Sequence, residues 1–152
     1  MDIRFSTAIH LLIMVSESED TLTSEMIAKS VGTNASYIRK IIGLLKKSGI
    51  VESHHGKSGI SLLQTSDELS LLDIYQSVTE SYEPHLFDLH KNANDECVVG
   101  RYIEPVLTET FSEMEQSFAS SLQSITLLDC INRMRKTMTD DEMTMGDDEF
   151  HR

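Results

Sequence analysis

The sequence contains few cysteines, no long hydrophobic run and few basic residues, and each scarcity excludes a class of protein. No stretch of roughly eighteen apolar residues occurs, so we expect no membrane span. The first residues lack the basic, apolar and small-residue segments of a signal peptide, which favours a cytoplasmic protein. The two cysteines, Cys97 and Cys130, are too few for a disulfide framework or, by themselves, for a zinc site. What is present, 152 residues of which 39% are hydrophobic, suffices for one domain or for a small domain with an extension.

Positive charge is scarce overall but concentrated in one region. The chain has 13 basic and 25 acidic residues and a net charge of −12, which by itself argues against nucleic-acid binding. Residues 26–60, however, contain six basic side chains and one acid, a local charge of +5 that leaves −17 for the remainder. Because phosphate contacts depend on the field within about 8 Å at physiological salt, the local charge matters more than the total. The pattern is typical of a DNA-binding face attached to an acidic partner domain, although a merely solvated basic helix would have the same charge.

Apolar spacing and capping residues predict three helices in the first fifty residues. The first follows Ser6, and the second begins after the N-cap Thr23 and ends at Gly32. Asn34 is a favourable N-cap for a third helix that runs to about Ser48. Its apolar stripe faces the core, and its other face carries Ser36, Tyr37, Arg39, Lys40, Gly43 and Lys46. A short helix, a tight turn and a second helix with polar residues near its start are typical of a helix-turn-helix.

Two short strand-like segments, residues 50–53 and 60–63, follow this third helix directly. Between them lies a glycine-rich basic turn, residues 54–59, and the arrangement predicts a β-hairpin. A hairpin after a recognition helix is a wing. The sequence therefore predicts a mainly α-helical winged helix-turn-helix domain with a small β wing over residues 1–82.

The second half of the chain predicts an arm. A capping box of Ser70 and Asp73 opens a helix to about residue 80, and a polar connector spans residues 83–97. A long helix then carries apolar residues spaced three or four apart, as in a coiled-coil seam: Ile103, Leu107, Phe111, Met114, Phe118, Leu122 and Ile125. We interpret this stripe as a dimer interface, with packing inside the monomer as the alternative.

The end of the chain predicts a short helix and a tail. Thr126 and Asp129 form a second capping box, so residues 98–136 comprise the long dimerisation helix and a short capped helix. Residues 137–152 are rich in methionine, threonine and acids, a composition that predicts a disordered acidic tail.

Together these segments resemble the Rrf2 family of winged-helix regulators, from Arg4 to about residue 136. The matching segments are RFSTAIHLLIMVSES, TSEMIAKSVGTNASYIRKIIGLLKKSGIVES, the Gly-Lys-Ser-Gly wing and LSLLDIYQSVTE. The resemblance implies a homodimer that binds a pseudo-palindromic operator in double-stranded DNA, usually as a repressor. It places in the major groove the exposed start of the third helix: Asn34, Ser36, Tyr37, Arg39 and Lys40. Lys46 lies farther along the same face, and the wing residues His54, His55 and Lys57 would reach phosphates or the minor groove.

The cysteines depart from the iron–sulfur branch of that family. That branch places three cysteines in the connector, whereas only Cys97 occurs here, so we expect no iron–sulfur cofactor. Some similar regulators sense oxidants or electrophiles through a cysteine at this place, and a helix N-terminus makes a thiol more reactive. Cys97 is therefore either a thiol switch or an incidental cysteine. In a related oxidant-sensing design, this cysteine pairs with a second cysteine in the recognition-helix region, but Thr33 stands at the corresponding position here, so that pairing is excluded. We expect Cys130 to pack on an apolar helix face.

Other combinations of residues are weaker indications. His85, Asp88, His90 and Cys97 have no spacing that suits a compact metal site, so we predict none. Tyr82 and Phe87 would line a small effector pocket or simply pack at a hinge. No phosphate loop, nucleophile–base pair or metal motif indicates an enzyme. The leading hypothesis is a DNA-binding regulator, with a winged-helix protein–protein module or a regulator responding to a small ligand without redox sensing as the alternatives.

Overall fold

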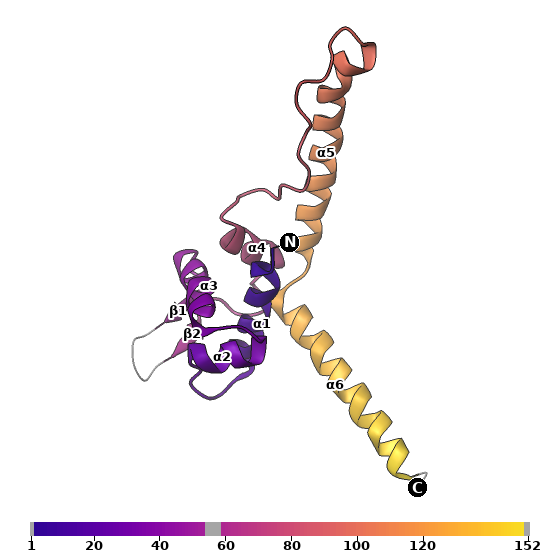
Figure 1. Cartoon of the computed structure of the whole chain (residues 1–152). Coiled ribbons are helices and arrows are strands. Elements are labelled where there is room, and N and C mark those ends of the chain that lie inside the picture. Colours follow the sequence, from indigo (N-terminus) through magenta and orange to yellow (C-terminus); the bar gives the residue numbers. More distant parts are fainter. Residues whose placement is uncertain (1, 54–58, 151–152) are drawn as a thin grey trace.

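The structure is a computed structural model and describes residues 2–53 and 59–150 (Figure 1). It is mainly helical with a small two-stranded sheet, as predicted. Along the chain the elements are α1 (Arg4–Glu17), α2 (Ser24–Val31), α3 (Ala35–Lys47), β1 (Val51–Ser53), β2 (Ile60–Leu62), α4 (Leu71–Thr79), α5 (Val98–Ser124) and α6 (Leu127–Phe150). The first four helices and the hairpin form a compact unit, from which α5 and α6 project in different directions (Figure 1). Among the described residues, no helix is both long and apolar enough to cross a bilayer.

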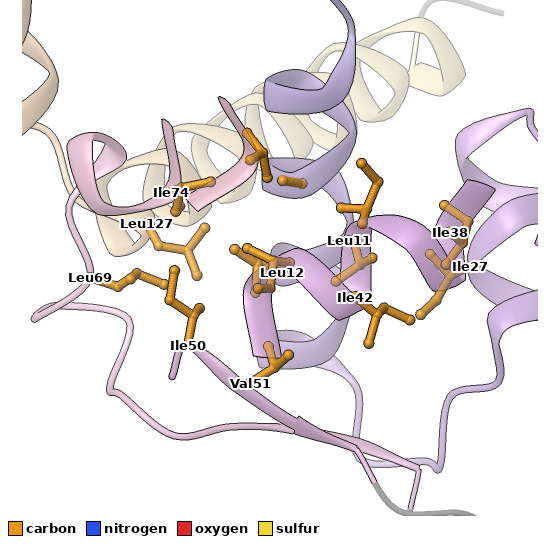
Figure 2. Packing of buried hydrophobic residues seen from close by; sticks show 14 of the residues in the cluster. Leu11, Leu12, Ile27, Ile38, Ile42, Ile50, Val51, Leu69, Ile74 and Leu127 are labelled. Carbon is orange, nitrogen blue, oxygen red and sulfur yellow. The ribbon is translucent and has the colours of Figure 1, made fainter. Parts of the chain in front are cut away.

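One hydrophobic core holds the N-terminal unit together and also includes the start of α6. Leu11 and Leu12 of α1 lie near Ile42 of α3 in the middle of the cluster, and Ile38 of α3 lies beside Ile27 of α2 (Figure 2). The cluster extends to Leu127, which is fully buried. Because α6 supplies core residues, the junction of α5 and α6 is fixed on the N-terminal unit rather than joined to it by a loose linker.

The helices begin at the caps that the sequence predicts. The side chains of Thr23 and Asn34 accept hydrogen bonds from Met26 N (3.2 Å) and Tyr37 N (2.8 Å). Gly32 ends α2 with a φ of 86°, a conformation that glycine adopts without strain. These caps fix the angle between α2 and α3, which gives the helix-turn-helix its shape.

Hydrogen bonds between the starts of α4 and α6 attach the arm to the N-terminal unit. Ser70 and Asp73 form the predicted capping box of α4, and Thr126 and Asp129 form the corresponding pair at α6. The two helix starts lie side by side, because Leu127 N donates to the carbonyl of Leu69 at 2.8 Å.

The hairpin is antiparallel, with Glu52 opposite Ser61.

The long helix forms as predicted, but the C-terminal end of its apolar stripe packs within the chain. Leu122 is buried in the core, and Phe118 and Ile125 pack against it. The ring of Phe118 meets Tyr75 of α4 edge-on at 5.9 Å, and Tyr75 in turn meets Phe5 at 5.4 Å. These three residues therefore pack within the chain, which was the alternative to a dimer interface. The spacing is right, but the tertiary fold brings the first domain onto the same stripe.

The N-terminal half of the stripe lies beneath the connector. Ile103, Leu107 and Phe111 are half-buried there, whereas Met114 is 48% exposed. Phe111 contacts Phe87 of the connector at a ring distance of 5.0 Å. The connector runs alongside α5 and turns back at its N-terminal end (Figure 1), so this half of the stripe too is partly covered within the chain.

The predicted short last helix and disordered tail are replaced by one long helix. α6 continues from its anchored start through residue 137 to Phe150. The segment lacks proline, and the hydroxyls of Thr137 and Thr139 donate to carbonyls four residues earlier, each at 3.0 Å. Arg135 also joins α6 to α1 through both carboxylate oxygens of Glu17, at 2.8 and 2.9 Å. Composition predicted disorder because the segment buries little, but helical bonds satisfy the backbone locally.

Candidate nucleic-acid interface

The exposed face of α3 carries small and basic side chains, as predicted. The opposite face is buried in the core through Ile38, Ile41, Ile42 and Leu45. The exposed positions recur at intervals of three or four residues and therefore lie along one side of the helix: Ser36, Arg39, Lys40, Gly43 and Lys46. None of the buried residues is charged, so the positive charge of α3 is directed outward.

Much of this charge is uncompensated. Lys40 and Lys46 have no ion-pair partner among the described residues. Arg39 lies 3.5 Å from Glu25, but both side chains are largely exposed, at 57% and 72%. Such a pair contributes little and is readily exchanged for a phosphate or a base edge.

A groove beside α3 extends the interface to residues that the sequence analysis did not select. It measures about 360 Å³ and lies between the start of α2, the middle of α3 and the hairpin. Thr23 and Ser24 bring the N-terminus of α2 to the groove, and Arg39, Gly43 and Lys46 line its α3 side. Helix N-termini carry free N–H groups and a partial positive charge, which favour phosphate. The predicted N-cap at Thr23 was a signal that could have identified this anchor.

Two predicted site residues also have structural roles. Tyr37 is half-buried and packs against the core, and its hydroxyl is buried without a hydrogen-bond partner in the described part of the chain. Its ring is therefore partly used in packing, and a contact of Tyr37 with DNA stays a prediction. Asn34 is exposed, but its carbonyl oxygen caps α3, which leaves only its amide nitrogen for a base or phosphate.

The base of the wing, at Ser53, Gly59 and Ile60, lines the edge of this groove. The predicted contacts His54, His55 and Lys57 fall outside the described residues. The second strand returns past Gly59, where an added Cβ would lie 2.7 Å from Thr21 Cγ2. This close approach holds the base of the hairpin against the loop before α2.

Comparison with known proteins assigns the chain to a family. The Rrf2 model, described as an iron-dependent transcriptional regulator, matches residues 1–133. The chain belongs to the Rrf2 family of transcription regulators. It is 40% identical to YwnA of Bacillus subtilis, named as an HTH-type transcriptional regulator, over 131 residues that cover 86% of this chain and 96% of YwnA. The family and this relative are described as transcription regulators rather than enzymes, in agreement with the sequence analysis.

Solved structures agree with the fold. A crystal structure described as that of a DNA-binding protein is 37% identical and aligns with a TM-score of 0.68, covering 84% of this chain and 98% of its own. The global cysteine regulator CymR of B. subtilis is only 19% identical, but aligns with a TM-score of 0.65 over 87% of this chain and 95% of CymR. The resemblance to CymR therefore concerns the fold alone.

The iron dependence in the family description does not fit the ligands that this chain offers. Three connector cysteines would be needed for a cluster held by three thiolates, and the chain has Cys97 alone there. Cys130 is half-buried on α6, and no group of three His, Cys, Asp or Glu side chains within residues 2–53 and 59–150 is arranged to hold a metal. His85 is instead hydrogen-bonded to Asp88 at 2.6 Å, which raises the pKa of its imidazole.

The two thiols differ in their surroundings. Cys97 is exposed and occupies the N-cap position of α5, where the backbone N–H groups of Gly100 and Val99 lower the pKa of its thiol. Burial raises the pKa of Cys130. A lowered pKa enlarges the thiolate fraction near neutral pH, which favours reaction at Cys97 over Cys130.

Proposed function

We propose that this chain is a homodimeric repressor that binds a palindromic operator, with α3 of each subunit in the major groove. The observation that carries the proposal is the exposed α3 face, on which Lys40 and Lys46 are uncompensated beside the groove at the start of α2. Ser36, Arg39 and the Asn34 amide would contact base edges, whereas the lysines, Thr23 and Ser24 would contact phosphates. His54, His55 and Lys57 remain proposed wing contacts.

The dimer is proposed through a face of α5 that differs from the predicted stripe. Val99, Tyr102 and Val106 follow one side of the helix at intervals of three and four residues and are 67%, 57% and 55% exposed. On α6, Met134 and Met138 form a second exposed apolar pair. Apolar side chains grouped in this way favour association, and an interface between identical copies requires one self-complementary surface.

Two-fold symmetry explains the expected operator. A dimer presents two copies of α3, so the half-sites should be inverted repeats separated by about one helical turn, roughly 34–36 Å, or a multiple of it. Repression then follows where the operator overlaps a promoter.

A mobility-shift assay on DNA upstream of the chain's own gene, repeated across a salt series, tests the DNA contacts. Lys40→Ala should weaken binding and reduce the slope of log K against log salt by about one. The matched control is Lys136→Ala on exposed α6, which should change neither quantity. Equal behaviour of the two variants would remove α3 from the interface.

Sedimentation tests the dimer. Val106→Glu should shift the chain toward monomer, whereas Gln116→Glu, an exposed α5 position with the same added charge, should leave the dimer intact. A dimer that survives Val106→Glu and instead dissociates in Met114→Glu would return the interface to the apolar stripe first predicted.

We further propose that electrophiles release the repressor by adding to Cys97. In the reaction with a quinone, the thiolate forms an S–C bond, and the displaced π electrons move to a carbonyl oxygen, which is protonated. The hydrogen on the attacked ring carbon then transfers to the second carbonyl oxygen, which gives the hydroquinone adduct. The exposed thiol and its lowered pKa support this step. Release by a quinone should disappear in Cys97→Ser and persist in Cys130→Ser; equal release in wild type and Cys97→Ser would exclude the thiol switch.

A further inference from the structure

The connector forms an arch over α5 that is fastened at both ends. At one end, Leu86 N donates to Glu115 Oε1 at 2.8 Å, and Phe87 contacts Phe111. At the other end, Arg101 Nε donates to the carbonyl of Asp95 at 2.9 Å. Since both ends are tied to α5, the space beneath the arch is formed before any ligand arrives.

Gly100 allows the connector backbone to approach α5 closely at this second end. A Cβ built there would lie 2.0 Å from the carbonyl oxygen of Asn94, a separation that only glycine avoids. The connector backbone therefore rests directly on the first turn of α5 and closes that end of the space.

Between the fastenings lies a cavity of about 820 Å³. Its apolar wall comes from Leu89 of the connector and from Ile103 and Leu107 of α5, and Phe87 and Phe111 form an aromatic end. Pockets for small molecules usually measure about 300–1,000 Å³ and combine apolar walls with a few polar groups. Phe87 thus lines a pocket, as one reading of the sequence suggested, whereas Tyr82 is 84% exposed and lies outside it.

The negative charge of the cavity lining favours a positively charged ligand. Four carboxylates line it, against the cations Lys91 and Arg101 and the titratable side chains of His85 and His90: Asp88, Asp95, Glu104 and Glu115. Residues 83–124 as a whole contain eight acidic and two basic side chains, a charge of −6 with neutral histidines. An aromatic end adds attraction for a cation placed over a ring. Cations are therefore attracted to this arm, and organic anions are repelled.

We infer that the cavity beneath the arch binds a lipophilic organic cation with a flat aromatic body. The aromatic body would lie against Leu107, Ile103 and the two phenylalanines, and its positive charge would face Glu104 and Asp95. The consequence for transcription rests on the proposed function: the connector leads from α4, whose Ser77 donates to the carbonyl of Leu44 in α3 at 3.0 Å. A ligand held beneath the arch can therefore act on α3 through the connector and α4.

Fluorescence titration of the full chain with rhodamine 6G, an aromatic cation, tests the inference, with fluorescein as the anionic control. Rhodamine 6G should bind saturably, one molecule per chain, whereas fluorescein should not. Glu104→Gln should weaken binding about fivefold, the effect of one nearby charge at a partly exposed site. Glu109→Gln removes the same charge from α5 outside the cavity lining and should change binding by less than twofold. Ser112→Trp, which places an indole in the lining, should abolish binding.

Three results would overturn the inference: no saturable binding, equal binding of both dyes, or equal weakening by Glu104→Gln and Glu109→Gln. If the partner subunit of a dimer filled the cavity, no saturable dye binding would be observed. Operator binding is measured on the same preparations without dye. Intact operator binding with no dye binding refutes the ligand site alone, whereas dye binding without operator binding refutes the proposed function alone.

Discussion

Gly43 offers a substitution for which folding and DNA binding should change in opposite directions. It lies on the exposed face of α3, and a Cβ added there meets no atom within 4 Å. Glycine within a helix costs about 0.5–1 kcal/mol relative to alanine, so Gly43→Ala should stabilise the free protein by that amount. At about 2–4 °C for each kcal/mol in a chain of this size, the melting temperature should rise by a few degrees at most.

Operator affinity should fall in the same variant. If α3 lies in the major groove, Gly43 faces DNA at close approach, and an added methyl group has to displace the helix. Inserting a methyl group into a packed contact typically costs about 1–3 kcal/mol, so we expect affinity to fall about tenfold.

Differential scanning fluorimetry and mobility shift on one preparation measure both effects. Asn132→Ala on α6, also exposed and within a helix, is the matched control, because it should stabilise the fold without changing operator affinity. Unchanged or tighter operator binding by Gly43→Ala would refute the placement of this turn of α3 against DNA.

Three further substitutions test the packing and the thiols. Leu127→Ala should destabilise the protein by about 2–5 kcal/mol in a single unfolding transition, because this fully buried α6 residue belongs to the core of the N-terminal unit; a melting curve that is unchanged or split in two would contradict the shared core. Tyr37→Phe should leave operator affinity within about twofold and stability unchanged or slightly higher, because its buried hydroxyl has no partner among the described residues; a large loss of affinity would make the Tyr37 hydroxyl a DNA contact. Iodoacetamide should modify Cys97 before Cys130, as followed by peptide mass spectrometry, because the pKa of Cys97 is lowered and that of Cys130 is raised. The difference between the two modification rates should narrow as pH rises above the ordinary thiol pKa. Preferential modification of Cys130 would contradict this order.

Local features were predictable because they depend on neighbouring residues. Thr23, Asn34 and Ser70 cap helices in the structure as the sequence predicted, since a cap requires only a short polar side chain and a backbone N–H two or three residues away. The exposed basic face of α3 followed from its spacing in the same way. The groove at the start of α2 was missed, because it depends on how α2, α3 and the hairpin lie relative to one another.

The apolar stripe of α5 shows where sequence reasoning alone reaches its limit. Spacing predicts that a stripe is covered, but it does not name the surface that covers it. Here Phe118 and Leu122 meet the first domain, and Leu107 lies beneath the connector, so the stripe assigned to a partner is largely used within the chain. The opposite failure occurred in α6, where composition predicted disorder but an anchored first turn extends as a helix.

The sequence by itself determined the winged helix-turn-helix, the basic exposed face of α3 and the single cysteine of the connector, because caps, periodicity, local charge and residue counts need no knowledge of distant contacts. Only the tertiary structure decided which apolar surfaces are satisfied within the monomer. It also decided that Tyr37 packs against the core and that the connector and α5 together line a cavity. Each of these depends on segments that are far apart in the chain and meet only in the folded protein.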